Sequence, residues 1–227
     1  MDYIYSHVFF HQERDVMTEY RTIVSPSSAT LLEKKSEFIA QLSPIQTQEE
    51  ALAFLENIRR QHRKARHNVY AYRLRKDNAS RYSDDGEPQG TAGIPILDVL
   101  QKQGLTDICC VVTRYFGGVL LGANGLVRAY SHSTAMAVEN ARICIMYPCY
   151  SVTIQMDYTQ YGKVFYLLSK ANEDLEIQNT IFTDQVKISL QIKENTWQAL
   201  NHDLMEQTSG QIQIETGALK YVDFSEK

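Results

Sequence analysis

The chain has 227 residues, with 23 Lys and Arg against 27 Asp and Glu, and 44% of its residues are hydrophobic. These values are typical of a soluble globular protein and exclude a disordered or collagen-like chain. No apolar run approaches the roughly 18–20 residues that a membrane span needs. The first residues also lack the basic start and long apolar core of a secretory signal. We therefore expect a cytoplasmic protein that has no membrane contact.

The four cysteines show neither a C-x-x-C pair nor a cysteine/histidine pattern of zinc spacing. Cys109 and Cys110 stand inside the apolar run ICCVV, which predicts buried thiols in a reducing compartment. The six histidines have no metal spacing, and the motifs of ordinary hydrolases are missing from the sequence. The sequence therefore predicts no cofactor.

The net charge of −4 is distributed unevenly along the chain. Residues 150–227 hold six Lys, no Arg and eleven acids, a net charge of −5, and the other residues together carry +1. Within that first part, residues 59–81 contain nine basic residues against Asp77 alone, a net charge of +8. The pattern indicates a basic, anion-facing region in a protein whose second half is acidic.

The first half mixes strand and helix patterns. Strand-like stretches at 20–24 and 37–42 precede a helix from about Thr47 to His67, with acids at its start and arginines at its end, as the helix dipole favours. The inner face of this helix has apolar residues and a histidine at helical spacing: Ala51, Leu55, Ile58 and His62. NVYAYRLR then alternates as a strand.

Further along, the loop 83–93 leads into a short helix that begins near Pro95. TDICCVVTRYF is apolar enough to be buried on both faces, which predicts a central strand. A glycine-rich turn at 117–125 follows. The helix after it has apolar residues at a 3.6-residue period from Leu126 to Ala141.

The second half predicts the order βαββαβ. Strands are expected at 151–156, 175–182 and 184–192, with a closing strand in QIQIETGALKYVDF. One helix covers YTQYGKVFYLLSKA. The other has Asn195 as its expected N-cap, Gly210 at its end, and one apolar face made by Trp197, Leu200 and Leu204. This order is that of the ferredoxin-like, split βαβ arrangement.

Three segments follow from these patterns. Residues 1–16 differ in character from the rest, and Met17 is a natural start, so we expect an N-terminal extension there. A first domain covers 17–147 and a ferredoxin-like second domain covers 150–227, with the boundary near Pro148. The fold class is α+β.

Two stretches are too particular to arise from generic patterning: RYSDDGEPQGTAGIPIL (81–97) and VVTRYFGGVLLGANGLVRAYS (111–131). Together they resemble the signature of the IMPACT/YigZ family, SDDGEP-x-GTAG followed by VTRYFGG and LG-x-GGLVRAY. The chain departs from that signature at Asn124 and Ser131, where glycine is common. Because Asn tolerates a left-handed backbone better than most residues, the turn at Asn124 is expected to survive.

The resemblance implies a first domain like the second domain of a small-subunit ribosomal protein. It implies a second domain that resembles the fifth domain of translation elongation factor G. Eukaryotic relatives are linked to translational control through a ribosome-associated kinase pathway, and bacterial members are expected to contact nucleic acid or ribosomes. Fold-level likeness is analogy, because one fold serves many functions.

The glycine-rich turn is a candidate phosphate site, because unpaired backbone N–H groups ahead of a helix attract anions. Arg114 and Arg128 flank the turn and would add bidentate contacts. The candidate residues of the turn are Gly117, Gly118, Gly122, Asn124 and Gly125. The alternative is a tight turn that needs glycine, with both arginines paired to acids of the SDDGEP loop. We give the two interpretations equal weight.

The family motif loop also has two interpretations. Its residues are Ser83, Asp84, Asp85, Gly86, Glu87, Pro88, Gly90 and Thr91. Asp84, Asp85 and Glu87 would suit Mg²⁺, which prefers oxygen ligands, and Mg²⁺ would support phosphoester chemistry. Asp-Gly and Glu-Pro are also ordinary turn formers, and the carboxylates can bond nearby backbone N–H groups or form salt bridges. We favour the turn or salt-bridge interpretation.

The basic stretch 59–81 mixes cations with aromatic rings, as in an RNA-binding face, and Arg59, Arg63 and Arg66 are its candidate binding residues. The alternative is a solvated helix end, with Tyr70 and Tyr72 turned to the core. We favour binding slightly. The resulting hypothesis is a cytoplasmic protein without catalytic activity that binds RNA or the ribosome and modulates translation. The alternatives are a Mg²⁺-dependent enzyme acting on a phosphorylated ligand, and an adaptor whose second domain binds a partner protein.

Overall fold

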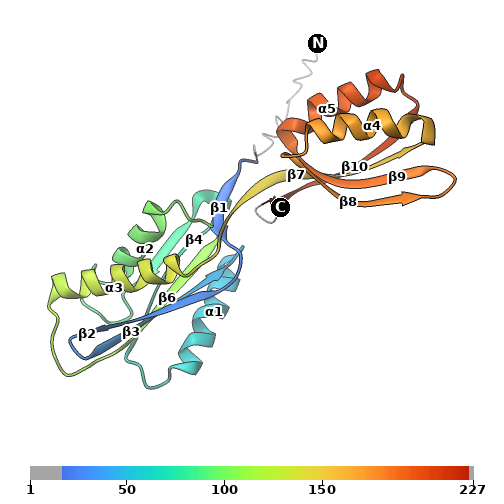
Figure 1. Cartoon of the computed structure of the whole chain (residues 1–227). Coiled ribbons are helices and arrows are strands. Elements are labelled where there is room, and N and C mark those ends of the chain that lie inside the picture. Colours follow the sequence, from blue (N-terminus) through green and yellow to red (C-terminus); the bar gives the residue numbers. More distant parts are fainter. Residues whose placement is uncertain (1–16, 225–227) are drawn as a thin grey trace, which may run out of the picture. The chain divides into compact units, whose positions relative to one another are not determined.

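The computed structural model describes residues 17–224, so the expected extension at 1–16 lies outside the described residues. The chain forms two compact units, one of residues 20–147 with 221–224 and one of residues 148–220 (Figure 1). Each unit combines helices with an antiparallel sheet, which confirms the predicted α+β class. In the described part of the chain, no helix is long and apolar enough to cross a membrane.

The first unit is built on a five-stranded sheet in the order β2-β3-β6-β4-β5. The strands are β2 (Ser27–Glu33), β3 (Ser36–Pro44), β4 (His67–Arg73), β5 (Ser80–Ser83) and β6 (Ile108–Tyr115). All residues of β6 before Tyr115 are buried, and β6 is the middle strand. The predicted central strand is therefore confirmed, whereas the sequence patterns missed β2 and β5.

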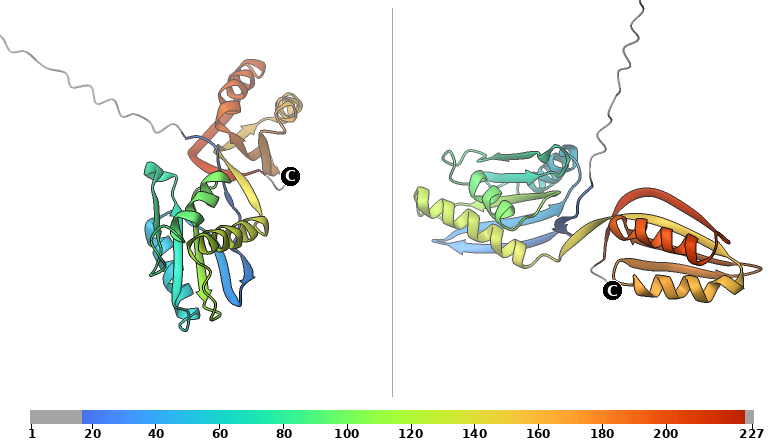
Figure 2. Two further views of the ribbon diagram at one scale, coloured as in Figure 1. Left: turned by 90° about the vertical axis from the view of Figure 1, so that its left-hand side faces the viewer. Right: turned by 90° about the horizontal axis from the view of Figure 1, so that it is seen from above.

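Helices cover both faces of this sheet (Figures 1 and 2). Helices α2 (Gly93–Lys102) and α3 (Ala123–Glu139) pack on the face that carries Cys110 and Val112. Helix α1 (Gln48–Gln61) packs on the opposite face, against Cys109 and Val111. The alternation of β6 thus divides its apolar side chains between two cores, and both predicted thiols are buried.

Helix α1 is shorter than predicted. Thr47 is its N-cap and accepts a hydrogen bond from the Glu50 N–H, but the helix ends at Gln61 rather than near His67. The prediction failed because His62 leaves helical geometry, and its ring contacts the Tyr115 hydroxyl (3.0 Å) and the Gln41 amide (3.2 Å). The chain can then begin β4 at His67. A short 3₁₀ turn, Lys76–Asn78, follows β4.

The second unit has the predicted order βαββαβ. It contains most of β7 (Ile143–Met156) and of β10 (Ile212–Asp223), and all of α4 (Tyr158–Lys170), β8 (Leu175–Phe182), β9 (Val186–Lys193) and α5 (Glu194–Gln207). The strands lie in the order β10-β7-β9-β8, and β1 (Tyr20–Ile23) pairs with the first residues of β7. Helices α4 and α5 share one face of the sheet (Figure 2).

The core of the second unit confirms the predicted helix faces. Trp197, Leu200 and Leu204 of α5 are buried together with Val164 and Leu168 of α4. Asn195 is not the N-cap of α5, however, because the helix already begins at Glu194 and Lys193 occupies the capping position. Strand β9 therefore runs directly into the helix.

Candidate functional site

The SDDGEP loop is tied down by its own carboxylates, beginning with Asp84. One Asp84 oxygen accepts from the N–H groups of Ala92 (3.1 Å) and Gly93 (2.8 Å), and the other accepts from Gly90 N–H (2.8 Å). Gly93 is the first residue of α2. Asp84 therefore satisfies N–H groups that the start of a helix leaves without intrahelical partners.

Asp85 connects the loop to two other elements. Its carboxylate accepts from Arg59 Nη2 of α1 (3.0 Å) and from the backbone N–H of Asn68 in β4 (2.6 Å). Its carbonyl oxygen lies 2.8 Å from Nδ1 of His67. Arg59, predicted as a binding residue, is thus partly engaged inside the protein.

Glu87 forms a buried ion pair with Arg114. Its Oε1 lies 2.6 Å from Arg114 Nη1 and accepts from the Tyr130 hydroxyl at 2.8 Å. The two charged side chains are 4% and 7% exposed. Burial and the neighbouring Glu87 carboxylate raise the pKa of Tyr130, so its hydroxyl remains a donor. Arg114 is therefore held inside the first unit.

The three loop carboxylates thus bond different protein donors, in agreement with the favoured turn or salt-bridge interpretation. In residues 17–224, no group of three or more His, Cys, Asp or Glu side chains is arranged to hold a metal ion. The magnesium alternative remains a prediction without an observation in its favour.

The glycine-rich turn packs against the tip of the β2–β3 hairpin at Gly117. A Cβ atom on Gly117 would lie 2.0 Å from the backbone of Lys35, so no other residue fits there without displacing the hairpin. The Gly117 N–H donates to the Ser36 hydroxyl at 3.1 Å. Gly118 and Gly122 have φ values of +85° and +71°, which glycine adopts without strain.

The hairpin tip itself is the feature that the sequence patterns missed. Lys34 and Lys35 connect β2 to β3 with φ values of 46° and 67°, in the left-handed region that favours Asn and Gly in two-residue hairpins. Both side chains are exposed and bond no other described residue. The signal was present, because two alternating apolar stretches in ATLLEKKSEFIA are separated by two residues.

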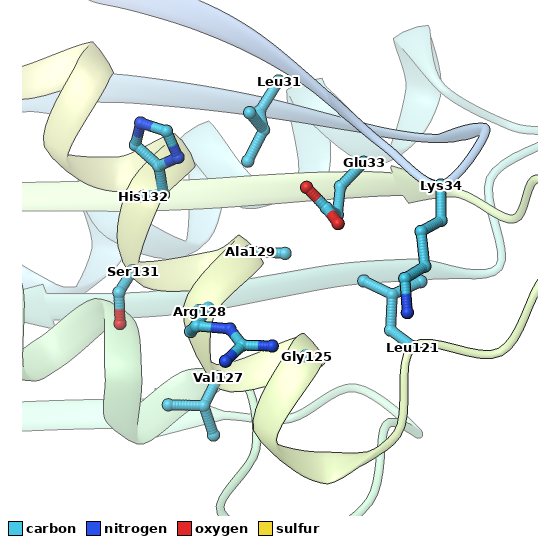
Figure 3. Close-up of a pocket in the computed structure, with 10 residues that line it drawn as sticks. All are labelled: Leu31, Glu33, Lys34, Leu121, Gly125, Val127, Arg128, Ala129, Ser131 and His132. Atoms are coloured by element: carbon cyan, nitrogen blue, oxygen red, sulfur yellow. The ribbon is translucent and has the colours of Figure 1, made fainter.

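A cavity of about 480 Å³ lies between the end of the hairpin and the start of α3. The hairpin lines it with Leu31, Glu33 and Lys34, and the turn and helix line it with Leu121, Gly125, Val127, Arg128, Ala129, Ser131 and His132. Figure 3 shows Lys34 and Arg128 entering from these two sides. Arg128 is exposed and bonds no other described residue, which distinguishes it from Arg114.

The N-terminus of α3 beside this cavity has no side-chain cap. Gly122 occupies the capping position, and Gly122, Ala123 and Asn124 are exposed. Asn124 is the second residue of the helix and is not left-handed, so the expected reason for its tolerance is wrong. Gly125 packs closely under Leu121, because a Cβ atom on Gly125 would lie 2.9 Å from the Leu121 Cβ.

The basic stretch divides between exposed and engaged residues. Arg63 and Arg66 are exposed beyond the end of α1. Arg73 donates to the Leu105 carbonyl, and Arg75 lies over the rings of Tyr20 and Tyr221. The ring of Tyr72 is buried and that of Tyr70 packs against the same core, as the alternative to an RNA-binding face expected for these two rings.

Both motifs and the basic helix end meet at one end of the first sheet. Tyr115, the last residue of β6, contacts His62 at the end of α1, and the glycine-rich turn begins directly after it. Phe116 in that turn is 47% exposed, and the Arg114 guanidinium lies 5.5 Å from its ring centre. This end of the sheet therefore presents cations, an open helix start and an exposed ring.

The fold defines a two-domain α+β protein whose candidate site is a basic surface. The Impact N-terminal domain family model matches residues 34–138, and a domain of unknown function (DUF1949) matches residues 154–211. The IMPACT family member YvyE of Bacillus subtilis is 34% identical over 209 residues, which are 92% of this chain and 95% of that protein.

The IMPACT family member YigZ of Escherichia coli is 37% identical over 155 residues, covering 66% of this chain and 76% of that protein. A solved structure described as a crystal structure of a hypothetical protein has a TM-score of 0.58 and 29% identity, covering 93% of this chain and all of that one. The chain therefore belongs to the IMPACT family, as its two motifs predicted.

Proposed function

We propose that this protein binds RNA, including RNA on the ribosome, and modulates translation in the cytoplasm. The observation that carries the proposal is the arrangement of exposed residues at one end of the first sheet. There the exposed Lys34 and Arg128 line the cavity beside the uncapped start of α3, together with Glu33. The backbone of Lys35 packs on Gly117, and the ring of Phe116, in the same turn, is exposed. Phosphate is attracted by such cations and free N–H groups, and an exposed ring can stack on a base.

The cations at the end of α1 support the same proposal. Arg63 and Arg66 are exposed near the start of the glycine-rich turn, since His62 contacts Tyr115. They would supply longer-range attraction, which does not need a fixed geometry. Arg114 was expected to contact phosphate directly. Its ion pair with Glu87 instead stabilises the SDDGEP loop beside the strand that leads into the glycine-rich turn.

Family membership is the second support. The resemblance implies that eukaryotic relatives act in translational control. It also implies that the two domains are like the second domain of a small-subunit ribosomal protein and the fifth domain of elongation factor G. An RNA ligand at the basic end of the first sheet would agree with both implications.

The test is co-sedimentation of the full chain with purified ribosomes at about 50 and about 200 mM salt. Each neutralised phosphate releases counterions, so six to ten phosphate contacts lower the affinity by about 10³–10⁵ over this interval. A variant with Lys34→Gln and Arg128→Gln should lose most of the co-sedimentation at the lower salt concentration.

The matched control is Lys76→Gln with Lys102→Gln, which removes the same charge at two exposed positions of the first unit. Lys76 lies at the opposite end of the first sheet from the glycine-rich turn. It follows the end of β4 that pairs with the start of β6, whereas the turn follows the end of β6. If both variants lose binding equally, general charge explains the interaction and the assigned site is wrong. If the unaltered protein binds neither ribosomes nor free ribosomal RNA at about 50 mM salt, the proposed function is wrong.

A further inference from the structure

The second unit exposes a preformed cluster of rings where α4 meets the end of β8. We call Tyr158, Tyr161, Phe165 and Phe182 the aromatic patch. Tyr158 and Phe182 are 53% and 54% exposed, and their ring centres lie 6.4 Å apart. Tyr161 lies 5.5 Å from Phe182 and 5.7 Å from Phe165. Because the Tyr158 hydroxyl also donates to the Thr183 carbonyl at 2.6 Å, the rings are held in one arrangement.

The aromatic patch adjoins an open sheet edge. Strand β8 is the last strand in the order β10-β7-β9-β8, so its outer edge pairs with no other strand of the described chain. Exposed edges are normally protected by lysine, proline or short length. β8 has eight residues, neither lysine nor proline, and a single charge at Glu176. The edge strand β5 of the first unit, by contrast, has four residues and carries Arg81.

The half of β8 nearest the patch is regular. A register shift lies between Ile177 and Asn179, but Asn179–Phe182 pair residue by residue with β9. Ile181 in this half is 46% exposed and lies opposite Lys187. A regular backbone edge with apolar side chains beside it is the surface to which extended peptides add a strand.

Helix α4 has one further feature without a function inside the unit. Gly162 lies in the middle of the helix, where glycine is less favourable than alanine. A Cβ atom there would meet nothing within 4 Å, so the fold does not require glycine. Gly162 lies one turn from both Tyr158 and Tyr166 along the helix, and its missing side chain leaves room for close approach by a ligand.

We infer that the edge of β8 and the aromatic patch bind an extended segment of a partner protein by strand addition. The open face of the sheet indicates the chemistry of the other side chains of that segment. Lys187 is exposed there, opposite Ile181, on the face of β9 away from the core that α4 and α5 cover. Because alternate side chains of an added strand point to opposite faces of the sheet, the segment would alternate apolar side chains, facing the patch, with acidic side chains near Lys187.

The ring geometry favours a protein segment over nucleic acid. A base stacks on a free ring face, whereas Phe182 already lies against Tyr158 and Tyr161. The inference is independent of the proposed RNA site, which lies in the first unit.

The test begins with a displayed library of random 12-residue peptides selected against the full chain. Selected peptides should alternate β-branched or aromatic residues with Asp and Glu. Hydrogen exchange of the full chain with a synthetic selected peptide should show slowed amides in residues 179–182. Fluorescence anisotropy should show that Ile181→Glu lowers the peptide affinity at least tenfold and that Phe182→Ala has a similar effect.

The matched control is Leu32→Glu, the same change at an exposed strand residue of the first unit, which should leave the affinity unchanged. Ile181→Glu places an acid opposite Lys187, so the fold should tolerate it. The inference is overturned if no selected peptide depends on Ile181, or if protection lies outside β8. It is also overturned if poly(U) RNA or a second copy of this chain, detected by light scattering, occupies these residues instead.

Discussion

Arg114 and Arg128 flank the same glycine-rich turn, yet the fold uses them in opposite ways. Arg114 is buried and paired to Glu87, whereas Arg128 is exposed at the wall of the cavity beside α3. The difference arises from their elements. Arg114 lies on β6 opposite Phe38, on the face that α3 covers, and Arg128 lies on the outer side of α3. An arginine of a sequence motif can therefore either stabilise the fold from inside or remain accessible to a ligand.

The same contrast separates the two motif loops. The SDDGEP loop directs its carboxylates inward, to the start of α2, to β4 and to Arg114. The glycine-rich turn leaves N–H groups at the start of α3 facing outward without a side-chain cap. Substitutions in the first loop should therefore change stability, and substitutions around the second should change binding.

The largest effect is expected at Glu87. Glu87→Ala leaves Arg114 and the Tyr130 hydroxyl buried without their acceptor, which should lower the free energy of unfolding by about 3–5 kcal/mol. Urea denaturation followed by circular dichroism measures the change. Glu139→Ala, at an exposed position of α3, is the control and should change stability by less than about 0.5 kcal/mol. A loss at Glu87 no larger than at Glu139 would contradict the structural role of the pair.

A second prediction concerns two neighbouring glycines. Gly117→Ala places a methyl group against the Lys35 backbone and should destabilise by about 1–3 kcal/mol. Gly118→Ala meets no atom within 4 Å and has only the strain of its positive φ, about 1 kcal/mol. The same denaturation experiment compares them, and equal losses would show that packing of the turn on the hairpin does not matter.

Asp84→Ala tests the cap of α2. Three N–H groups lose their acceptor, and we expect a loss of about 0.5–2 kcal/mol, as at other helix N-caps. Asp84→Asn retains an acceptor oxygen and should lose less. If Asp84→Asn instead removed a Mg²⁺-dependent turnover without a stability change, the magnesium alternative would regain support.

The hairpin tip offers a prediction of opposite sign. Lys34 and Lys35 have a left-handed backbone, which Asn and Gly adopt with less strain. Replacing them by Asn and Gly should therefore raise the free energy of unfolding by about 1 kcal/mol. The same variant should weaken ribosome co-sedimentation at about 50 mM salt because it removes two cations. Unchanged co-sedimentation would exclude the hairpin from the binding surface.

The smallest stability effect is expected at Arg128. Arg128→Gln removes an exposed side chain that bonds no other described residue, so stability should change by less than about 0.5 kcal/mol. Its effect should be confined to ribosome binding and to the salt dependence of that binding. A clear loss of stability would indicate that Arg128 is structural, like Arg114.

Much of the architecture was predictable because it depends on local patterns. The βαββαβ order, the buried β6 and the inner face of α5 all follow from the period of apolar residues. One error arose where a tertiary contact decided the outcome. Helix α1 ends early at His62, whose ring bonds Tyr115. The error at Asn124 is local: α3 already begins at Ala123, so Asn124 is an ordinary helical residue.

The sequence by itself determined the family, the order of most elements and the residues that can bear charge. These properties depend on residue identity and on neighbours a few positions away. Only the tertiary structure decided which cations are available, because that depends on partners distant in sequence. Glu87 neutralises Arg114, and the backbone of Lys35 packs on Gly117. No local sequence pattern encodes either of these two contacts, since both form when separate strands and loops come together at one end of a sheet.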